Sequence, residues 1–169
     1  MKSIKKAVAL LLVATLIMSI VTFTALASSE YTDVPSNHWA SGVIAKWSGD
    51  GYGVLEGNGD GTFAPSRGMT LGELANVLSK TFGYTQRVSA NVTPGWADEA
   101  VEKAIAAGVI AKVATIDASV TVSREQAVRY IALAYGIASA EGDTTFADDA
   151  AIGAEYKPYV RAFQELGHV

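Results

Sequence analysis

The pattern of apolar and polar positions predicts a mainly helical chain. After an uncharged apolar run at residues 7–23, apolar residues recur at helical spacing in four stretches, each bounded by turn-forming residues. This spacing gathers the apolar side chains on one face of a helix, whereas a half-buried strand would need strict alternation. The predicted helices run from Trp39 to about Ser48, from Thr70 to Thr81, from Ala97 to Ala107, and from Ser123 to about Tyr135.

Two of these helices begin with the same capping pattern. Ser123 is followed by Gln126 at the third helical position, and Thr70 is followed by Glu73 in the same way. In such a capping box the hydroxyl accepts from a backbone N–H of the first turn, and the Glu or Gln side chain reaches back to the cap. The residue that follows the cap is Arg124 in one helix and Leu71 in the other.

The apolar faces indicate which side chains should be buried. The first helix would bury Trp39, Val43, Ile44 and Trp47, and the third would bury Val101, Ala104 and Ile105. Between the first two helices, a loop rich in Gly, Asn and Asp contains Phe63, which we expect to plug into the core. Short helix–loop–helix units of this kind cannot bury their apolar faces singly, so neighbouring units should pack together.

The chain repeats itself. Trp39-Ala40 aligns with Trp96-Ala97, and the helix opening at Thr70 aligns with that at Ser123. A third copy begins at Phe146-Ala147-Asp148, which matches Tyr31-Thr32-Asp33, and places Val160, Leu166 and Gly167 where the second copy has Val101, Ala107 and Gly108. Two full repeats and one partial repeat follow, and we assign them to residues 28–84, 85–140 and 141–169.

The N-terminus has the features of a secretory signal. Lys2, Lys5 and Lys6 precede the apolar run, and Ala25-Leu26-Ala27 matches a signal-peptidase cleavage pattern. We therefore predict a signal peptide at residues 1–27; the alternative is an uncleaved membrane anchor. The whole chain has a net charge of −4, and the loss of three lysines would leave 10 basic against 17 acidic residues, a charge of −7.

The composition bears on compartment and partners. An acidic exported chain is a poor candidate for binding nucleic acid, and no membrane contact is expected after signal cleavage. The absence of cysteine from the sequence is typical of the bacterial envelope more than of small disulfide-built modules. His38 and His168 have no Cys or His partner at ligand spacing, so we expect no metal and no cofactor.

In its motifs the chain resembles the S-layer homology repeat. The first unit carries Tyr31-Thr32-Asp33-Val34-Pro35, His38-Trp39-Ala40, Gly59-Asp60-Gly61-Thr62-Phe63 and Met69-Thr70-Leu71-Gly72-Glu73. The second carries Trp96-Ala97, Ala107-Gly108-Val109-Ile110 and Val122-Ser123-Arg124-Glu125-Gln126, and the third matches only the opening half. The resemblance implies an all-α, pseudo-threefold bundle. It also implies a non-catalytic anchor at the bacterial cell surface that binds secondary cell wall polysaccharide, often pyruvylated, in grooves between repeats.

Arg124 is the central candidate for ligand binding. Backbone N–H groups, the helix dipole and a guanidinium fork converge at a helix N-terminus that begins with Arg, which suits a carboxylate. In the family the motif is Thr-Arg-Ala-Glu, and its arginine contacts the acidic ligand; by position that role falls to Arg124 alone, because Leu71 replaces it in the first copy. The alternative is a surface ion pair of Arg124 with Glu125, Asp117 or Glu73.

Other candidates have competing structural explanations. Ser123, Glu125 and Thr70 belong to the helix openings, and Asp33 is expected to serve first in a turn and second in a groove. Trp39 and Trp96 could stack on a sugar ring, but burial as core anchors is favoured for both.

An enzyme is not expected. The sequence has no cysteine nucleophile and no Gly-x-Ser-x-Gly motif, so a catalytic domain, if the parent protein has one, would lie beyond Val169. The main alternative is an S-layer or envelope subunit that self-assembles through protein contacts.

Overall fold

The computed structural model describes residues 31–49 and 52–168. The predicted signal peptide at residues 1–27 lies outside this part of the chain. The fold is all-α, as predicted, with very little strand. Its elements, in chain order, are α2 (Ser41–Ser48), α3 (Leu71–Phe82), β1 (Val92–Thr93), η1 (Gly95–Ala97), α4 (Asp98–Ala106), β2 (Ile116–Asp117), α5 (Arg124–Tyr135), η2 (Asp149–Ala151) and α6 (Lys157–Glu165).

The helices α3 and α5 have the capping boxes that the sequence predicts. The Thr70 hydroxyl accepts from the N–H of Glu73, whose carboxylate accepts from the N–H of Thr70. Ser123 and Gln126 exchange the same two bonds at α5. Both helices end at a glycine in the left-handed conformation, Gly83 with φ 62° and Gly136 with φ 68°. Each capping box satisfies N–H groups that the first helical turn leaves without partners.

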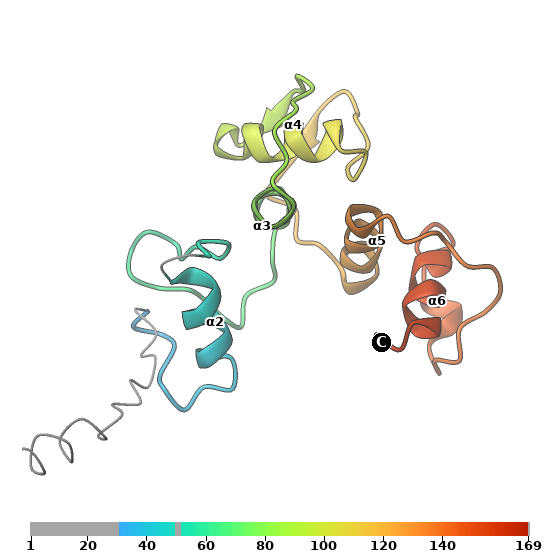
Figure 1. Cartoon of the computed structure of the whole chain (residues 1–169), viewed down its shortest axis with the longest axis horizontal. Coiled ribbons are helices and arrows are strands. Elements are labelled where there is room, and N and C mark those ends of the chain that lie inside the picture. Colours follow the sequence, from blue (N-terminus) through green and yellow to red (C-terminus); the bar gives the residue numbers. More distant parts are fainter. Residues whose placement is uncertain (1–30, 50–51, 169) are drawn as a thin grey trace, which may run out of the picture.

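Helices pack in pairs that cross the boundaries between repeats. Each second helix lies against the first helix of the next unit, so that α3 packs on α4 and α5 packs on α6. Figure 1 shows α3 and α5 at the middle of the molecule, with α2, α4 and α6 around them. This three-lobed arrangement is the one that a pseudo-threefold bundle of repeats predicts.

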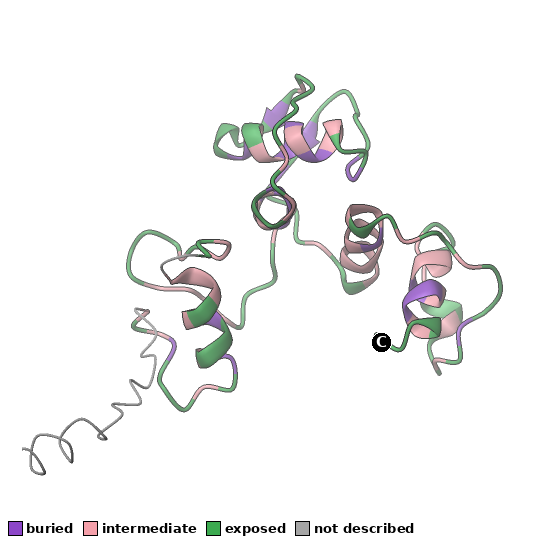
Figure 2. Ribbon diagram, viewed as in Figure 1, coloured by how far each residue is buried: buried purple, intermediate pink, exposed green. Residues whose placement is uncertain are grey.

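The core is concentrated at the first of these junctions. The main cluster joins α3 to α4 and to the two short parallel strands β1 and β2, which pair Val92 with Ile116. Val101 and Ala104 of α4 are fully buried, and Ile105 packs against the cluster, as the apolar pattern predicts. By contrast, α5 has only Ala132 fully enclosed (Figure 2). The α3–α4 junction is therefore the better packed of the two.

The first unit forms a separate small core. Val34, Ala40 and Ile44 are buried there, and Phe63 packs on them beside Tyr31 at 5.2 Å between ring centroids. The prediction that Phe63 plugs the core is confirmed. The predicted apolar face of α2 is wrong in part, because Val43 is 54% exposed and Trp39 is 87% exposed. Among the described residues, this face of α2 lacks the neighbouring helix that α4 and α6 each have.

Candidate functional site

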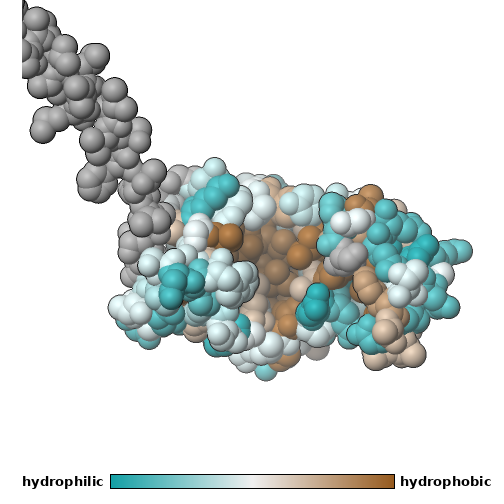
Figure 3. Space-filling view, turned by 90° about the horizontal axis from the view of Figure 1, so that it is seen from below, coloured by the Kyte–Doolittle hydropathy of each residue, from teal (hydrophilic) through white to brown (hydrophobic). Residues whose placement is uncertain are grey.

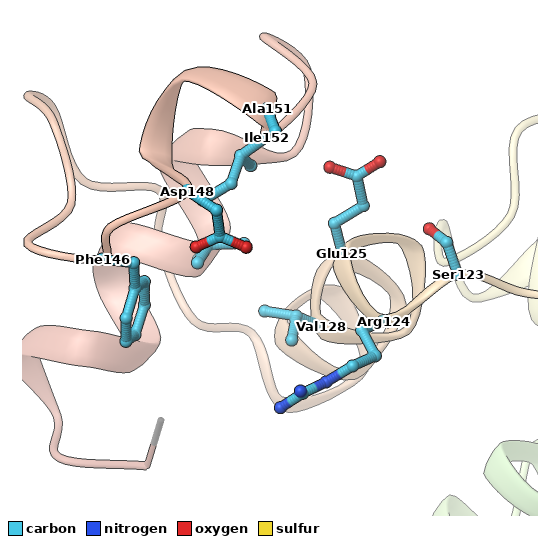
Figure 4. A pocket seen from close by; sticks show the side chains of 9 residues that line it. Ser123, Arg124, Glu125, Val128, Phe146, Asp148, Ala151 and Ile152 are labelled. Carbon is cyan, nitrogen blue, oxygen red and sulfur yellow. The ribbon is translucent and has the colours of Figure 1, made fainter.

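The sequence candidate Arg124 lies at a groove between the second and third units. The groove has a volume of about 450 Å³ and an opening to solvent. In Figure 4, Val128 points into the gap from α5 while Asp148 and Ile152 approach from the third unit, and Arg124 extends beside Val128 along one edge. The lining residues are Ser123, Arg124, Glu125 and Val128 from α5 and its cap, and Phe146, Asp148, Ala151, Ile152 and Val160 from the third unit.

Arg124 is the first residue of α5 and forms no ion pair with any described residue. The three acids considered as partners of Arg124 each bind another group, and Glu125 accepts from the Gly153 N–H. Glu73 pairs with Arg67, and Asp117 accepts from Ser119. The alternative considered for Arg124, a surface ion pair, is therefore not formed among the described residues. A charged guanidinium at a helix N-terminus is left available to an anion from outside the chain.

The carboxylate of Glu125 binds the third unit, which forms the other wall of the groove. One of its oxygens accepts from the N–H of Gly153 at 2.8 Å, which ties α5 to the third unit. The Gln126 side chain also approaches the Tyr156 hydroxyl at 3.4 Å. The start of α5 thus places Arg124 at the groove, while Glu125 and Gln126 contact the third unit and hold the two walls together.

Backbone donors at the start of α5 are also available. Among the described residues, no acceptor is found for the N–H groups of Arg124 and Glu125, which are the first two of the helix. At the matching positions of α3, the N–H of Leu71 donates to the Val120 carbonyl and that of Gly72 to the Ala118 carbonyl, both at 2.9 Å. The segment after β2 therefore closes the N-terminus of α3, whereas that of α5 stays open.

The first junction is closed by side chains as well. A Cβ at Gly72 would lie 2.9 Å from Ala97 Cβ and 2.9 Å from Trp96 Cη2, so the Trp96 ring covers the start of α3. Thr70 serves in the capping box there and does not line the Arg124 groove. In the part of the chain that the structure describes, the start of α3 therefore has neither the arginine nor the unpaired backbone N–H groups found at the start of α5.

Both tryptophans were expected to be core anchors, and this prediction is wrong. Trp39 is 87% exposed and Trp96 is 60% exposed. Trp39 stands at the start of the first helix, next to the His38 ring, and does not reach the Arg124 groove. Trp96 lines a different cleft, between α3 and α4. An exposed indole presents an apolar face to solvent, which is suited to stacking on a sugar.

Asp33 serves in a turn, as expected. Its carboxylate accepts from the N–H of Phe63 at 2.8 Å and that of Ala64 at 2.7 Å, and Ala64 has a left-handed φ of 56°. These backbone donors, that of Phe63 first, hold the pKa of Asp33 below its usual value. Asp33 therefore organises the loop of its own unit. Its counterpart Asp148 lines the Arg124 groove.

Several groove residues were not predicted from the sequence, namely Val128, Ala151 and Ile152. Phe146 and Val160 had been recognised only as repeat positions. The match of Phe146-Ala147-Asp148 to the opening of the first unit was the signal that could have placed this segment at the groove. Within residues 31–49 and 52–168, no cluster of side chains suited to a metal ion is found. In the same ranges, no helix has the length and apolar character needed to cross a membrane.

Comparison with known proteins places the chain in a family. The sequence pattern of the S-layer homology domain matches residues 30–75 and 89–128. A similar protein is S-layer protein EA1 from Bacillus anthracis, which is 31% identical over 96 residues. That alignment covers 57% of this chain and 11% of the relative, so the chain spans a small part of the relative's length.

Proposed function

The chain belongs to the S-layer homology domain family, and we propose that it is a non-catalytic module that attaches its protein to the bacterial cell wall. In this proposal the module is exported to the cell surface and binds secondary wall polysaccharide at the Arg124 groove. The observation that carries the proposal is that Arg124 forms no ion pair among the described residues and lies at an open cleft between two units.

The start of α5, away from the Asp148 side of the groove, is suited to a carboxylate on the polymer. A carboxylate at the start of α5 could accept from the Arg124 guanidinium and from the two free backbone N–H groups. Such an acid would be supplied by a pyruvyl ketal on a sugar. The apolar side chains of Val128, Phe146 and Ile152 would contact the less polar parts of the same sugar.

Ser123 and Glu125 support this site in the proposal, since one caps the helix and the other holds Gly153. Thr70, Trp39 and Asp33 lie outside this groove, so any contact they make with the polymer would be separate from the Arg124 site.

Co-sedimentation with purified sacculi tests the proposal. The protein is mixed with sacculi that retain the secondary polymer and with sacculi stripped of it, beside Arg124→Ala and Arg67→Ala. Arg67 is a matched control, because it is an exposed arginine near the opening of α3 that already pairs with Glu73. Retention should require the polymer and Arg124 but not Arg67. Retention that persists on stripped sacculi, or that Arg124→Ala leaves unchanged, would contradict the proposal.

A second candidate function is self-assembly through protein contacts. The observation in its favour is apolar surface gathered in the hollow between the α2 and α6 sides of the molecule (Figure 3). The name of the relative, an S-layer protein, fits the same candidate. Sedimentation velocity separates the two: a concentration-dependent oligomer that is indifferent to Arg124→Ala and to polymer would favour assembly.

A further inference from the structure

The loop between α2 and α3 contains a chemically reactive dipeptide. Asn58 is followed by Gly59, and it is the only asparagine of the sequence that precedes a glycine; the other three precede His38, Val77 and Val92. In an Asn-Gly pair the backbone nitrogen of the glycine can approach the side-chain amide carbon of the asparagine, because the glycine has no side chain in the way. By its sequence, Asn58 is therefore the asparagine most open to spontaneous deamidation.

The structure leaves this dipeptide uncovered. Asn58 and Gly59 are both exposed, and a Cβ at Gly59 would meet no heavy atom within 4 Å beyond its chain neighbours. Gly59 has a φ of 82°, which glycine adopts without strain. Among the described residues, its backbone N–H donates to no acceptor. In this part of the chain, the nitrogen that would attack is therefore held neither by packing nor by a hydrogen bond.

The other asparagines lie in more restrained surroundings. Asn76 lies inside the helix α3. Asn91 is followed by Val92, which is β-branched and buried. Asn37 is followed by His38, whose backbone N–H donates to a backbone carbonyl at 2.8 Å. These three asparagines are therefore internal references for the reactivity of the fourth.

We infer that Asn58 is a site of spontaneous deamidation that loosens the first unit. The deprotonated backbone nitrogen of Gly59 forms a bond to Cγ of Asn58, the bond from Cγ to Nδ2 breaks, and Nδ2 takes up a proton from water and leaves as ammonia. The resulting succinimide ring then takes up one water molecule. Opening of the ring at Cγ gives aspartate, and opening at the main-chain carbonyl gives isoaspartate, which has an additional carbon in the backbone. Either route replaces the amide with a carboxylate and needs no oxidant or reductant.

The product places a second negative charge on a loop that already has one. The Asn58 amide donates from Nδ2 to the Thr62 hydroxyl oxygen at 2.9 Å, and the same hydroxyl donates to Asp60 Oδ1 at 2.6 Å. A carboxylate at position 58 has no N–H to donate, so it would compete with Asp60 for the single hydroxyl proton of Thr62. Deamidation should therefore remove one hydrogen bond and add a like-charge repulsion within the loop.

The loop is also too closely packed to absorb an additional backbone atom. Gly57 lies against the Tyr31 ring, and a Cβ on it would lie 2.7 Å from the Thr62 carbonyl oxygen. The Gly61 carbonyl accepts from the Thr32 N–H at 2.9 Å. These contacts join the loop to the start of the unit on both sides of the reactive dipeptide. Isoaspartate should therefore disturb both contacts and, with them, the small core of the first unit.

The test is ageing of the whole protein at mildly alkaline pH, followed by digestion and mass spectrometry. Each asparagine peptide is scored for the mass gain of an amide-to-acid exchange, and isoaspartate is identified with a protein isoaspartyl methyltransferase. Asn58 should react at least tenfold faster than Asn37, Asn76 and Asn91 in the same sample. Its rate in the native protein should lie within tenfold of its rate in urea, because the native loop leaves the Gly59 nitrogen free.

Three variants connect the reaction to its consequence. Asn58→Asp carries the charge of one product, and it should speed trypsin cleavage after Lys46 of α2 at least threefold, as ageing of the unmodified protein should. Asn37→Asp is the matched control, because it adds the same charge at an exposed position outside the loop and should leave cleavage unchanged. Asn58→Gln keeps an amide but forms the cyclic intermediate far more slowly, so ageing should no longer speed cleavage.

Three results would overturn the inference. The first is that Asn58 reacts no faster than the other asparagines, and the second is that its native rate falls more than tenfold below the rate in urea. The third is that aged protein and Asn58→Asp are cut like the unmodified protein. Wall attachment through Arg124 is tested separately, because residues 123–160 of the second and third units line that groove.

Discussion

The junction between the first and second units and the junction between the second and third units each contain a helix with the same capping box. They differ in whether the start of that helix is covered. At the first, the carbonyls of Ala118 and Val120 accept the two leading N–H groups of α3, and Trp96 covers Gly72. At the second, the leading N–H groups of α5 have no acceptor among the described residues, and the groove beside them is open. One junction uses its helix N-terminus for folding, while the other leaves it free for a ligand.

Matched positions along the two helices show the same contrast. Ala75 of α3 is fully buried, whereas its counterpart Val128 lines the groove. Gly72 leaves room for close packing of Trp96 and Ala97, whereas its counterpart Glu125 reaches across to Gly153. Small residues close the first junction at the start of α3, and longer ones hold the second apart at the start of α5.

The largest expected effect on stability comes from the main core at the first junction. Leu78→Ala removes a buried side chain from it and should cost about 2–5 kcal/mol of unfolding free energy, the usual range for such a truncation. The matched substitution on α5, Ile131→Ala, affects a side chain that is only partly buried at the edge of the same cluster, and it should cost clearly less. Urea denaturation of both variants measures the difference. Equal losses would show that α5 contributes as much to this core as α3.

A smaller effect is expected at the pair Gly72 and Glu125. A Cβ at Gly72 would meet Ala97 and Trp96 at 2.9 Å, so Gly72→Ala should destabilise by about 1–3 kcal/mol through overpacking. Glu125→Ala loses its bond to the Gly153 N–H and should cost about 1 kcal/mol. Thermal unfolding of the two variants checks this order. An unchanged melting temperature for Gly72→Ala would show that Trp96 and Ala97 do not pack closely on Gly72.

The third unit should respond to acid through Asp149. Lys157 first, and then Thr144, hold the pKa of Asp149 at about 2, below the ordinary value of 3.8. Because the folded-state pKa is depressed, the stabilising contribution is complete above the ordinary value and is lost as pH falls toward 2. The protection of α6 amides against hydrogen exchange, measured relative to the intrinsic exchange rate at each pH, should therefore fall between about pH 4 and pH 2. Asp149→Asn should remove this pH dependence; if it persists, another group is responsible.

The smallest effect is expected from restoring the arginine of the first copy. Leu71→Arg reproduces the motif of the second copy, but the carbonyls of Val120 and Ala118 still occupy the helix N-terminus. Polymer retention should therefore change by less than about twofold, since no free backbone donors accompany the charge. Co-sedimentation of this variant beside the unmodified protein is the measurement. A large gain in retention would show that the charge alone makes the site.

Local features of the fold could be predicted from the sequence because they depend on neighbours in the chain. Ser123 with Gln126 and Thr70 with Glu73 define capping boxes within four residues, and the structure has both. Helix boundaries followed from the same caps and from glycines such as Gly83. The burial of Val101 and Ala104 followed from periodicity.

Features that depend on long-range contacts were harder to predict. The exposure of Trp39 could not be read from α2 itself, because periodicity shows that a face is apolar but not whether another element covers it. The closure of α3 depends on a segment some 50 residues further along the chain, at Ala118 to Val120, which belongs to none of the motifs found in the sequence. Arg124 was predicted as the free cation, but the opposite wall of its groove required the third unit to be placed.

The most direct test of the central claim is a two-by-two binding measurement by calorimetry. The protein and Arg124→Ala are each titrated with polymer fragments in their native and carboxyl-reduced forms. Hydrogen bonds to charged groups contribute about 1.5–3 kcal/mol, so Arg124→Ala should weaken binding of the native form about 10- to 100-fold. It should leave binding of the reduced form unchanged. An equal loss for both forms, or no loss for either, would contradict the assignment of Arg124 to the acidic group of the polymer.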